Sequence, residues 1–556
     1  MRSGYIALFA VLAWTAVHAT FGNKGVESLS DWATFGRYLF GVMAIVQLVM
    51  VTAASLLFSI GVIAQEKDRR TLLLLLMTDL KSRELVLGKL LGSLLPVLVL
   101  VGLSIPVFCL IRLLGGITLE QVLWSEALCV VTALVVGSWG TLVAYWREKT
   151  FQTLAIGVLG VVLLIGVAEG TVSLLGLESG VGRIAALLNP FRGLIDLLNP
   201  LSDRLSLEGG APVPPWHPIV ALGVLALLLI VVTSVMVRRW NPSQAVHEQG
   251  RRMKEEHVVA ERSRHRVVWE WPILWREIAT GAYGRKMLFI KLVYLAIAVA
   301  LFVWVRQPVF SEELVLGMLP RPAAAFVSLT IIGLLLVTAQ SVTSLTSEQD
   351  GQTLELLLVT EVTAKEFIFG KLFGVLYNTK EVLVVPLLML LMFRYEGGLS
   401  REDLLFLVIG FGSLTSFCAA LGLHMALSHD SSRQAILNSL GTVFFLFAGI
   451  FICLMLIVDA RQSFGLQLQV FGLFSGGGAL ALILLLTRKN ASSALMLCGL
   501  LLPFLTFYST VGFLQGDTGA VCAAVFCAYA FTTVAMLVPA ISEFDHALGR
   551  ARMDRG

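Results

Sequence analysis

The segment EKDRRTLLLLLMTDLKSRELVLGKL at residues 66–90 aligns without a gap with EQDGQTLELLLVTEVTAKEFIFGKL at residues 348–372. Twelve of the 25 positions are identical, and five of these are leucines, which general hydrophobicity can supply. The seven other identities are Glu66/Glu348, Asp68/Asp350, Thr71/Thr353, Thr78/Thr360, Glu84/Glu366, Gly88/Gly370 and Lys89/Lys371. The same spacing of 282 residues also relates Gly140/Gly422, Ala144/Ala426, Glu148/Asp430 and Gln152/Gln434. Two matches at one spacing predict an internal duplication.

The duplicated segments lie in a chain with the composition of a membrane protein. Of its 556 residues, 57% are apolar and 14% are charged, and the mean hydropathy is +0.85. Soluble globular domains carry about 25% charged residues. Seven cysteines lie inside apolar runs without a C-x-x-C pair, so we predict neither disulfides nor metal ligands from them. Most of the chain is therefore expected inside a bilayer.

We predict an all-α, polytopic transmembrane bundle of about 14 spans. A helix of about 20 apolar residues crosses the hydrocarbon core of a bilayer. Such runs lie near 5–20, 39–63, 90–111, 122–146, 151–173, 218–237, 289–305, 323–345, 372–393, 404–427, 434–458, 471–487, 493–511 and 520–540. The first run is short and follows Arg2, as in a signal peptide, but the matching run at 289–305 favours a retained span.

The distribution of basic residues predicts the orientation of the spans. With the N-terminus in the cytoplasm, the cytoplasmic segments hold 29 Lys and Arg residues and the outer loops hold 11. Cytoplasmic loops carry the excess of Lys and Arg in membrane proteins. Both termini are therefore expected in the cytoplasm, in an integral protein of the bacterial inner (plasma) membrane.

Six spans separate the two duplicated segments, so the two halves share one orientation and form parallel repeats. We predict a first half of six spans at 1–237, with an outer loop at 174–217. A basic cytoplasmic linker at 238–288 precedes a second half of six spans at 289–490. Two extra spans and a cytoplasmic tail follow at 491–556, without a counterpart in the first half.

Each duplicated segment is predicted to be a cytoplasmic helix that lies against the membrane. Thr71 or Thr353 can cap such a helix, and Lys89 and Lys371 can reach lipid headgroups from the start of the next span. An interfacial helix that orients the bundle would account for a single copy. Retention of the seven non-leucine identities in both copies favours a binding function.

The order of these elements resembles the permease subunit of type-2 ABC transporters, the ABC exporter family. Two spans precede a cytoplasmic E-x-x-x-x-T-L-x-x-L-L stretch, and G-K-L then leads into the third span, in both halves. The resemblance implies two fused permease halves whose coupling helices dock on a separate ATPase subunit. The residues that it assigns to ATPase coupling are Glu66, Asp68, Thr71, Lys89, Glu348, Asp350, Thr353 and Lys371.

The segment WEWPILWREIATGAYGRK at 269–286 resembles the amphipathic entry segment that precedes the first span in this family. Its candidate contact residues are Trp271, Pro272, Trp275, Arg276 and Glu277. The first half begins at MRSG without such a segment, so either that copy lost it or the start lies upstream. Between Arg238 and Lys286 there are 11 basic and 6 acidic residues. That balance favours a linker held at anionic lipid headgroups over an ATPase-docking surface.

A permease of this family requires ATP in a partner, because this chain contains no G-x-x-x-x-G-K-[ST] phosphate-binding loop. We therefore expect a cytoplasmic ABC ATPase, in two copies, and membrane lipids as partners. No cofactor in the chain itself and no nucleic acid are expected. The substrate is not readable from the sequence.

The alternative function is a secondary transporter with parallel internal repeats, which needs charged residues near the middle of the membrane. Lys380 and Glu381 are the candidates, although adjacent helix positions do not face each other. Glu126 and Glu169 lie near outer span ends, where we expect them to reach water. A membrane enzyme is disfavoured because G-x-S-x-G and H-E-x-x-H are absent, so no catalytic residue and no metal ligand is predicted.

Overall fold

The structure of the chain is a computed structural model. It describes residues 29–547 except 69–70, 148–149, 178, 199–213, 241–268, 270, 280–286, 307–318, 351–361, 430, 452, 455–463 and 489–491. The described chain forms two compact units, Met1–Ser263 with Gln462–Val470 and Arg264–Arg461 with Phe471–Gly556. Each unit is described by itself below.

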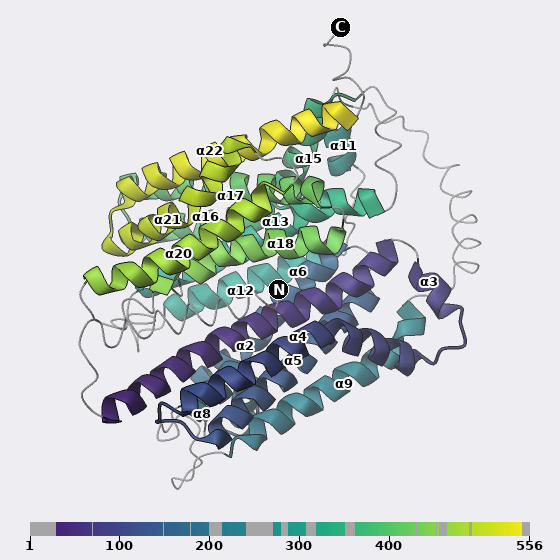
Figure 1. The fold of residues 1–556 in the computed structure, drawn as a ribbon. Coiled ribbons are helices and arrows are strands. Elements are labelled where there is room, and N and C mark those ends of the chain that lie inside the picture. Colours follow the sequence, from purple (N-terminus) through teal and green to yellow (C-terminus); the bar gives the residue numbers. More distant parts are fainter. Residues whose placement is uncertain are drawn as a thin grey trace. The chain divides into compact units, whose positions relative to one another are not determined.

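The prediction of an all-α polytopic bundle is confirmed. Within the described residues there are helices and no strands, and nine helices are long and apolar enough to cross a membrane (Figure 1). A bent pair, Ala364–Asn378 and Lys380–Tyr395, meets at 56° and can form a tenth span. The runs predicted at 289–305 and 471–487 give shorter apolar helices, Ile290–Val305 and Phe474–Leu486. The run at 5–20 lies outside the described residues.

In the first unit, helix α5 (Leu119–Trp146) is the central element. It packs against α2 (Leu29–Asp68), α4 (Ser82–Arg112), α6 (Thr150–Leu175) and α9 (Trp216–Trp240). The short helix α3 (Thr71–Leu76) connects α2 to α4. Leu72 of α3 joins a buried cluster with Ile63, Val86, Ala144, Tyr145 and Val237. The cytoplasmic segment is therefore anchored in protein through one leucine, while Leu74 stays 65% exposed.

The predicted outer loop contains a pair of short helices, α7 (Gly180–Leu188) and α8 (Pro190–Leu198), which pack back onto the bundle. Asn189 at their junction donates to Glu169 of α6 over 2.6 Å, and Arg192 forms an ion pair with the same carboxylate at 2.7 Å. Hydrogen bonding to Glu169 raises the pKa of Arg192. The two LLNP motifs of this loop thus help to build a folded helix pair tied to a span.

In the second unit, α17 (Arg401–Ser428) occupies the central position. It packs against α13 (Arg321–Asp350), α15 (Ala364–Asn378), α16 (Lys380–Tyr395), α18 (Ser432–Phe444) and α22 (Thr518–Ala547). Helix α18 continues into a π-helical turn at Phe445–Gly449. The unit also contains α11 (Pro272–Ala279), α12 (Met287–Val305), α20 (Phe464–Leu486) from Phe471 onward, and α21 (Ser493–Gln515), which packs against α22.

Local structure in the two units follows the 282-residue spacing closely. Helices α5 and α17 begin and end at positions that differ by 282, and Thr118 and Ser400 cap them by accepting from the backbone N–H three residues on. Glu84 and Glu366 accept from the backbone N–H of residues 81 and 363, which completes the start of the third span in each half. Free N–H groups at a helix start need such acceptors. The identity of these glutamates thus has a local structural cause.

The central helices approach their neighbours closely at matching glycines. A Cβ on Gly140 of α5 would collide with the Ser59 hydroxyl of α2, and one on Gly422 of α17 would lie 2.6 Å from Ser341 of α13. Ser341 occupies the position 282 residues after Ser59. The identity of Gly140 and Gly422 is therefore explained by helix packing, since any side chain would separate the two spans.

Candidate functional site

An ion pair joins the two ends of the duplicated segment in the first unit. Glu66 lies in the last turn of α2, and Lys89 lies in the third turn of α4. Their side chains form a salt bridge across the 23 residues of chain between them and are 20% and 27% exposed. Both residues were assigned to coupling from the sequence, and the structure brings them together.

The second unit repeats this ion pair and buries it. Lys371 of α15 lies 2.7 Å from Glu348 of α13 and 2.7 Å from Glu277 of α11, and it donates to the Ser344 carbonyl over 3.0 Å. The Lys371 side chain is 1% exposed, so it reaches no lipid headgroup. Arg276 adds a second cation to Glu348. We call Arg276, Glu277, Glu348 and Lys371 the entry-helix cluster.

The complementary charges in both units therefore come from the chain itself. The acids were expected to face cations of a protein partner, because acids are disfavoured beside an anionic leaflet. In the structure, lysines at equivalent positions of the third span meet Glu66 and Glu348. A charge that is paired and hydrogen-bonded can be buried at tolerable cost, whereas an unpaired one cannot. Pairing within the chain is thus a sufficient reason for both acids to be present in both halves.

Two glycines explain how the entry helix α11 reaches this cluster. A Cβ on Gly370 would lie 3.0 Å from the Ile273 Cβ, and one on Gly374 would lie 2.8 Å from the Glu277 Cβ. These glycines are four residues apart and so share one face of α15. Their missing side chains let α11 lie directly on that face, which places Glu277 beside Lys371.

The corresponding face in the first unit is open within the described residues. Gly88 and Gly92 occupy the equivalent positions, and a Cβ on either glycine would meet nothing within 4 Å. Lys89 is correspondingly more exposed than Lys371. The pairing of Gly92 with Gly374 was missed from the sequence because it falls two residues past the aligned segment, although both are glycine at the same spacing.

Leucine at Gly374 is expected to destabilise the second unit, because the new side chain overlaps Glu277 and separates α11 from Lys371. Overpacking of this kind costs about 1–3 kcal/mol. Thermal unfolding of the purified protein in detergent measures the effect. Gly92→Leu is the matched control, since its side chain enters open space. Equal unfolding temperatures for Gly374→Leu and the unchanged protein would rule out the packing described.

A third contact of the duplicated segments was not predicted. Lys67 donates to the carbonyls of Tyr145 and Arg147 over 2.7 and 2.8 Å, at the end of α5. At the equivalent place Gln349 donates to the Ala426 carbonyl of α17 over 3.3 Å. The last carbonyls of a helix lack partners within it, so either a lysine or a glutamine can satisfy them. Because the residue type differs between the copies, identity alone did not reveal this anchor.

The remaining coupling residues have mixed positions. Thr71 begins α3, and its exposed hydroxyl donates to the Glu66 carbonyl over 3.3 Å rather than capping the helix with an accepted hydrogen bond. Asp350 accepts a hydrogen bond from Ser432 of α18. The side chain of Asp68 and all of Thr353 lie outside the described residues. In the entry segment, the ring of Trp271 packs against Phe373 at 6.2 Å, while Pro272 and Trp275 lie on α11.

The intramembrane candidates Lys380 and Glu381 do not pair with each other. Glu381 forms an ion pair with Lys291 of α12 at 2.6 Å, and the Lys380 ammonium lies 3.9 Å from the Tyr377 ring centre. Glu126, expected to reach water, is instead 5% exposed and accepts hydrogen bonds from Gln47 and Ser104. That expectation was wrong because Glu126 lies two helical turns inside α5, where α2 and α4 cover it.

The comparison with known families is consistent with this arrangement. Residues 27–236 match the model of the family described as ABC-2 family transporter protein. Searches of curated proteins and of solved structures found no match. The matched range contains all the described spans of the first unit together with Glu66, α3 and Lys89. Residues 27–236 therefore form an ABC-2 family transporter domain, and the chain is an ABC-2 type permease.

Proposed function

We propose that this chain is the membrane subunit of an ABC exporter with two fused permease halves, driven by ATP hydrolysis in a separate ATPase. The observation that carries the proposal is the ion pair that closes the duplicated segment, Glu66–Lys89 in one half and Glu348–Lys371 in the other. Each pair fixes the end of the second span to the start of the third. The residues between them form a stiff loop on which a partner can push.

The contacts around each loop suggest how a push would reach the spans. In the first half, Lys67 ties the same loop to the end of α5, and Leu72 fixes α3 in the bundle core. In the second half, Gln349 makes the tie to α17, and α11 adds two further charges to the ion pair. Motion of the loop would therefore move three spans of its half together. Rigid-body motion of packed helices is a common form of such a transition.

Two equivalent loops suggest two ATPase subunits, each receiving one loop. We place the loops and both chain termini in the cytoplasm, following the 29 to 11 division of basic residues. The bacterial inner membrane is the proposed location. The exported substrate stays unassigned, because the coupling residues contact neither a cavity nor a transport path.

Co-purification tests the partner. We expect the tagged full chain, expressed with a candidate ABC ATPase, to elute as a complex whose mass corresponds to one permease and two ATPase copies. Reconstituted into vesicles, that complex should hydrolyse ATP faster than the ATPase alone. Active transport by the chain in vesicles without any nucleotide-hydrolysing subunit would contradict the proposal and favour a secondary transporter.

A further inference from the structure

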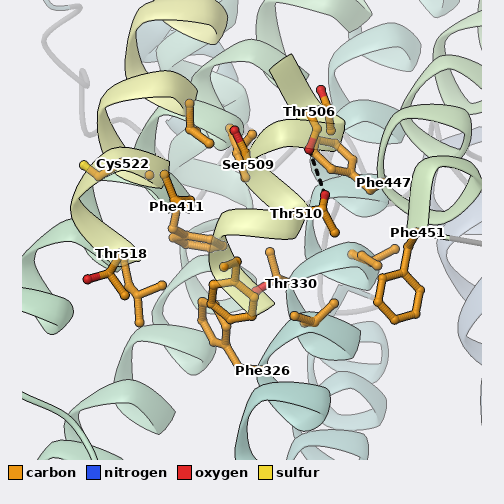
Figure 2. A pocket seen from close by; sticks show the side chains of 18 of the residues that line it. Phe326, Thr330, Phe411, Phe447, Phe451, Thr506, Ser509, Thr510, Thr518 and Cys522 are labelled. Carbon is orange, nitrogen blue, oxygen red and sulfur yellow. Dashed lines mark hydrogen bonds between the residues drawn. The ribbon is translucent and has the colours of Figure 1, made fainter. Parts of the chain in front are cut away.

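A cavity inside the second unit involves the two C-terminal spans. It lies among the starts of α13, α17 and α22, the end of α21, and the π-helical turn at Phe445–Gly449 (Figure 2). The space between these elements is about 1090 Å³, including its open part. Ligand cavities commonly measure about 300–1,000 Å³. The entry-helix cluster involves the other end of α13, so the cavity is a separate feature of the same unit.

The cavity wall is aromatic and aliphatic. Phe326, Phe411, Phe447 and Phe451 line it, and none of the described lining residues carries a charge (Figure 2). An apolar wall without a counter-charge favours an uncharged ligand, because a buried unpaired charge is costly. The composition therefore indicates a hydrocarbon chain.

One polar group in this wall lacks a partner. Thr506, Ser509 and Thr510 donate to carbonyls of their own helix, and Thr506 also bonds the Tyr529 hydroxyl over 2.6 Å. Thr330 is 8% exposed, and its hydroxyl is unpaired among the described residues. Figure 2 shows Thr330 among the side chains that border the cavity. A buried hydroxyl without a partner costs about 1–3 kcal/mol, so a ligand oxygen placed there would be favoured.

The first unit has no equivalent opening because leucines fill the corresponding positions. Leu48 stands where the second unit has Thr330, and Leu128 stands where it has Gly410. Both leucines are buried, with exposures of 0% and 3%. At Gly410 the nearest atom to an added Cβ is Val525 of α22, at 4.0 Å. Two small or polar residues and two added spans thus create a cavity that the repeat itself does not contain.

We propose that this cavity binds an uncharged membrane lipid, with its hydrocarbon chain between α17 and α22 and an ester or hydroxyl oxygen accepting a hydrogen bond from Thr330. The ligand is then an amphiphile with one neutral polar group rather than an ion or a sugar. Binding there would hold α21 and α22 against the second half. This assigns the two extra spans a role in forming a lipid site.

Photolabelling of the full chain in detergent micelles tests the site, with hexadecanol carrying a diazirine on its chain as the probe. We expect labelled peptides from α13, α17 or α22. Gly410→Leu, which extends into the cavity, should reduce labelling at least fivefold. Gly412→Leu is the matched control on the same helix, where an added Cβ meets nothing within 4 Å, and it should leave labelling unchanged.

Thr330→Val tests the hydrogen bond separately, because it keeps the side-chain shape. Loss of one hydrogen bond of about 0.5–1.5 kcal/mol corresponds to a reduction of about 2- to 13-fold in labelling at subsaturating probe. Hexadecanoic acid with the same diazirine, ionised at neutral pH, should label the site less than the alcohol. Labelling elsewhere, or labelling unaffected by Gly410→Leu in a variant with a normal gel-filtration profile, would overturn the proposal.

Discussion

Replacing Lys371 by methionine is expected to cost the second unit about 3–5 kcal/mol of stability, the range typical when one partner of a buried ion pair is removed. The side chain is 1% exposed and holds Glu277 and Glu348, which are 9% and 15% exposed. Without the ammonium, these two carboxylates face each other with only Arg276 beside them. We expect a large fall in unfolding temperature and in the yield of monodisperse protein.

The repeat provides the control for this experiment. Lys89→Met removes the equivalent lysine of the first unit, but there the side chain is 27% exposed and holds a single carboxylate. A partly exposed pair contributes about 0.2–1 kcal/mol, so the loss should be much smaller. Adding Glu277→Gln and Glu348→Gln to Lys371→Met should recover part of the stability, because neutral groups are cheaper to bury than unpaired charges. Equal losses for Lys371→Met and Lys89→Met would contradict the difference in burial.

The duplication made much of this fold predictable. Apolar runs gave the position of each described span within a few residues, because hydrophobic length is imposed by the bilayer. The 282-residue spacing also marked Glu66, Lys89, Glu348 and Lys371 as a related set. Their role was harder to infer, since a sequence does not show that a cation 23 residues away will be the partner of an acid.

Other features depended on packing that a single sequence does not reveal. Whether α11 covers a glycine face is decided by the size of neighbouring side chains, and Gly370 and Gly88 look alike in the sequence. Glu126 was misplaced because its depth was judged along one helix, whereas burial depends on the helices around it. The cavity depends on which residues of α21 and α22 meet α13 and α17, and these contacts have no template in the first half.

Coupling to the ATPase provides the second large effect. We expect Glu66→Ala and Glu348→Ala each to lower ATPase stimulation by the reconstituted complex, and the double variant to lower it more. A partly exposed ion pair of about 1 kcal/mol corresponds to roughly a fivefold change. Two distant sites that add independently give roughly 25-fold. Membrane insertion, followed by expression level, should stay normal, since both residues lie at helix ends.

Exchange of the two charges distinguishes a clamp within the chain from a docking contact. Glu66→Lys combined with Lys89→Glu restores the ion pair between α2 and α4 with opposite polarity. If the pair acts by stiffening the loop, the exchanged variant should regain most of the stimulation lost in Glu66→Ala. If Glu66 instead binds a cation of the ATPase, the exchange places a lysine against that cation and stimulation should fall further. Unchanged stimulation in the Glu66→Ala, Glu348→Ala double variant at normal expression would show that the loops only anchor the bundle, since neither acid would then transmit the stroke.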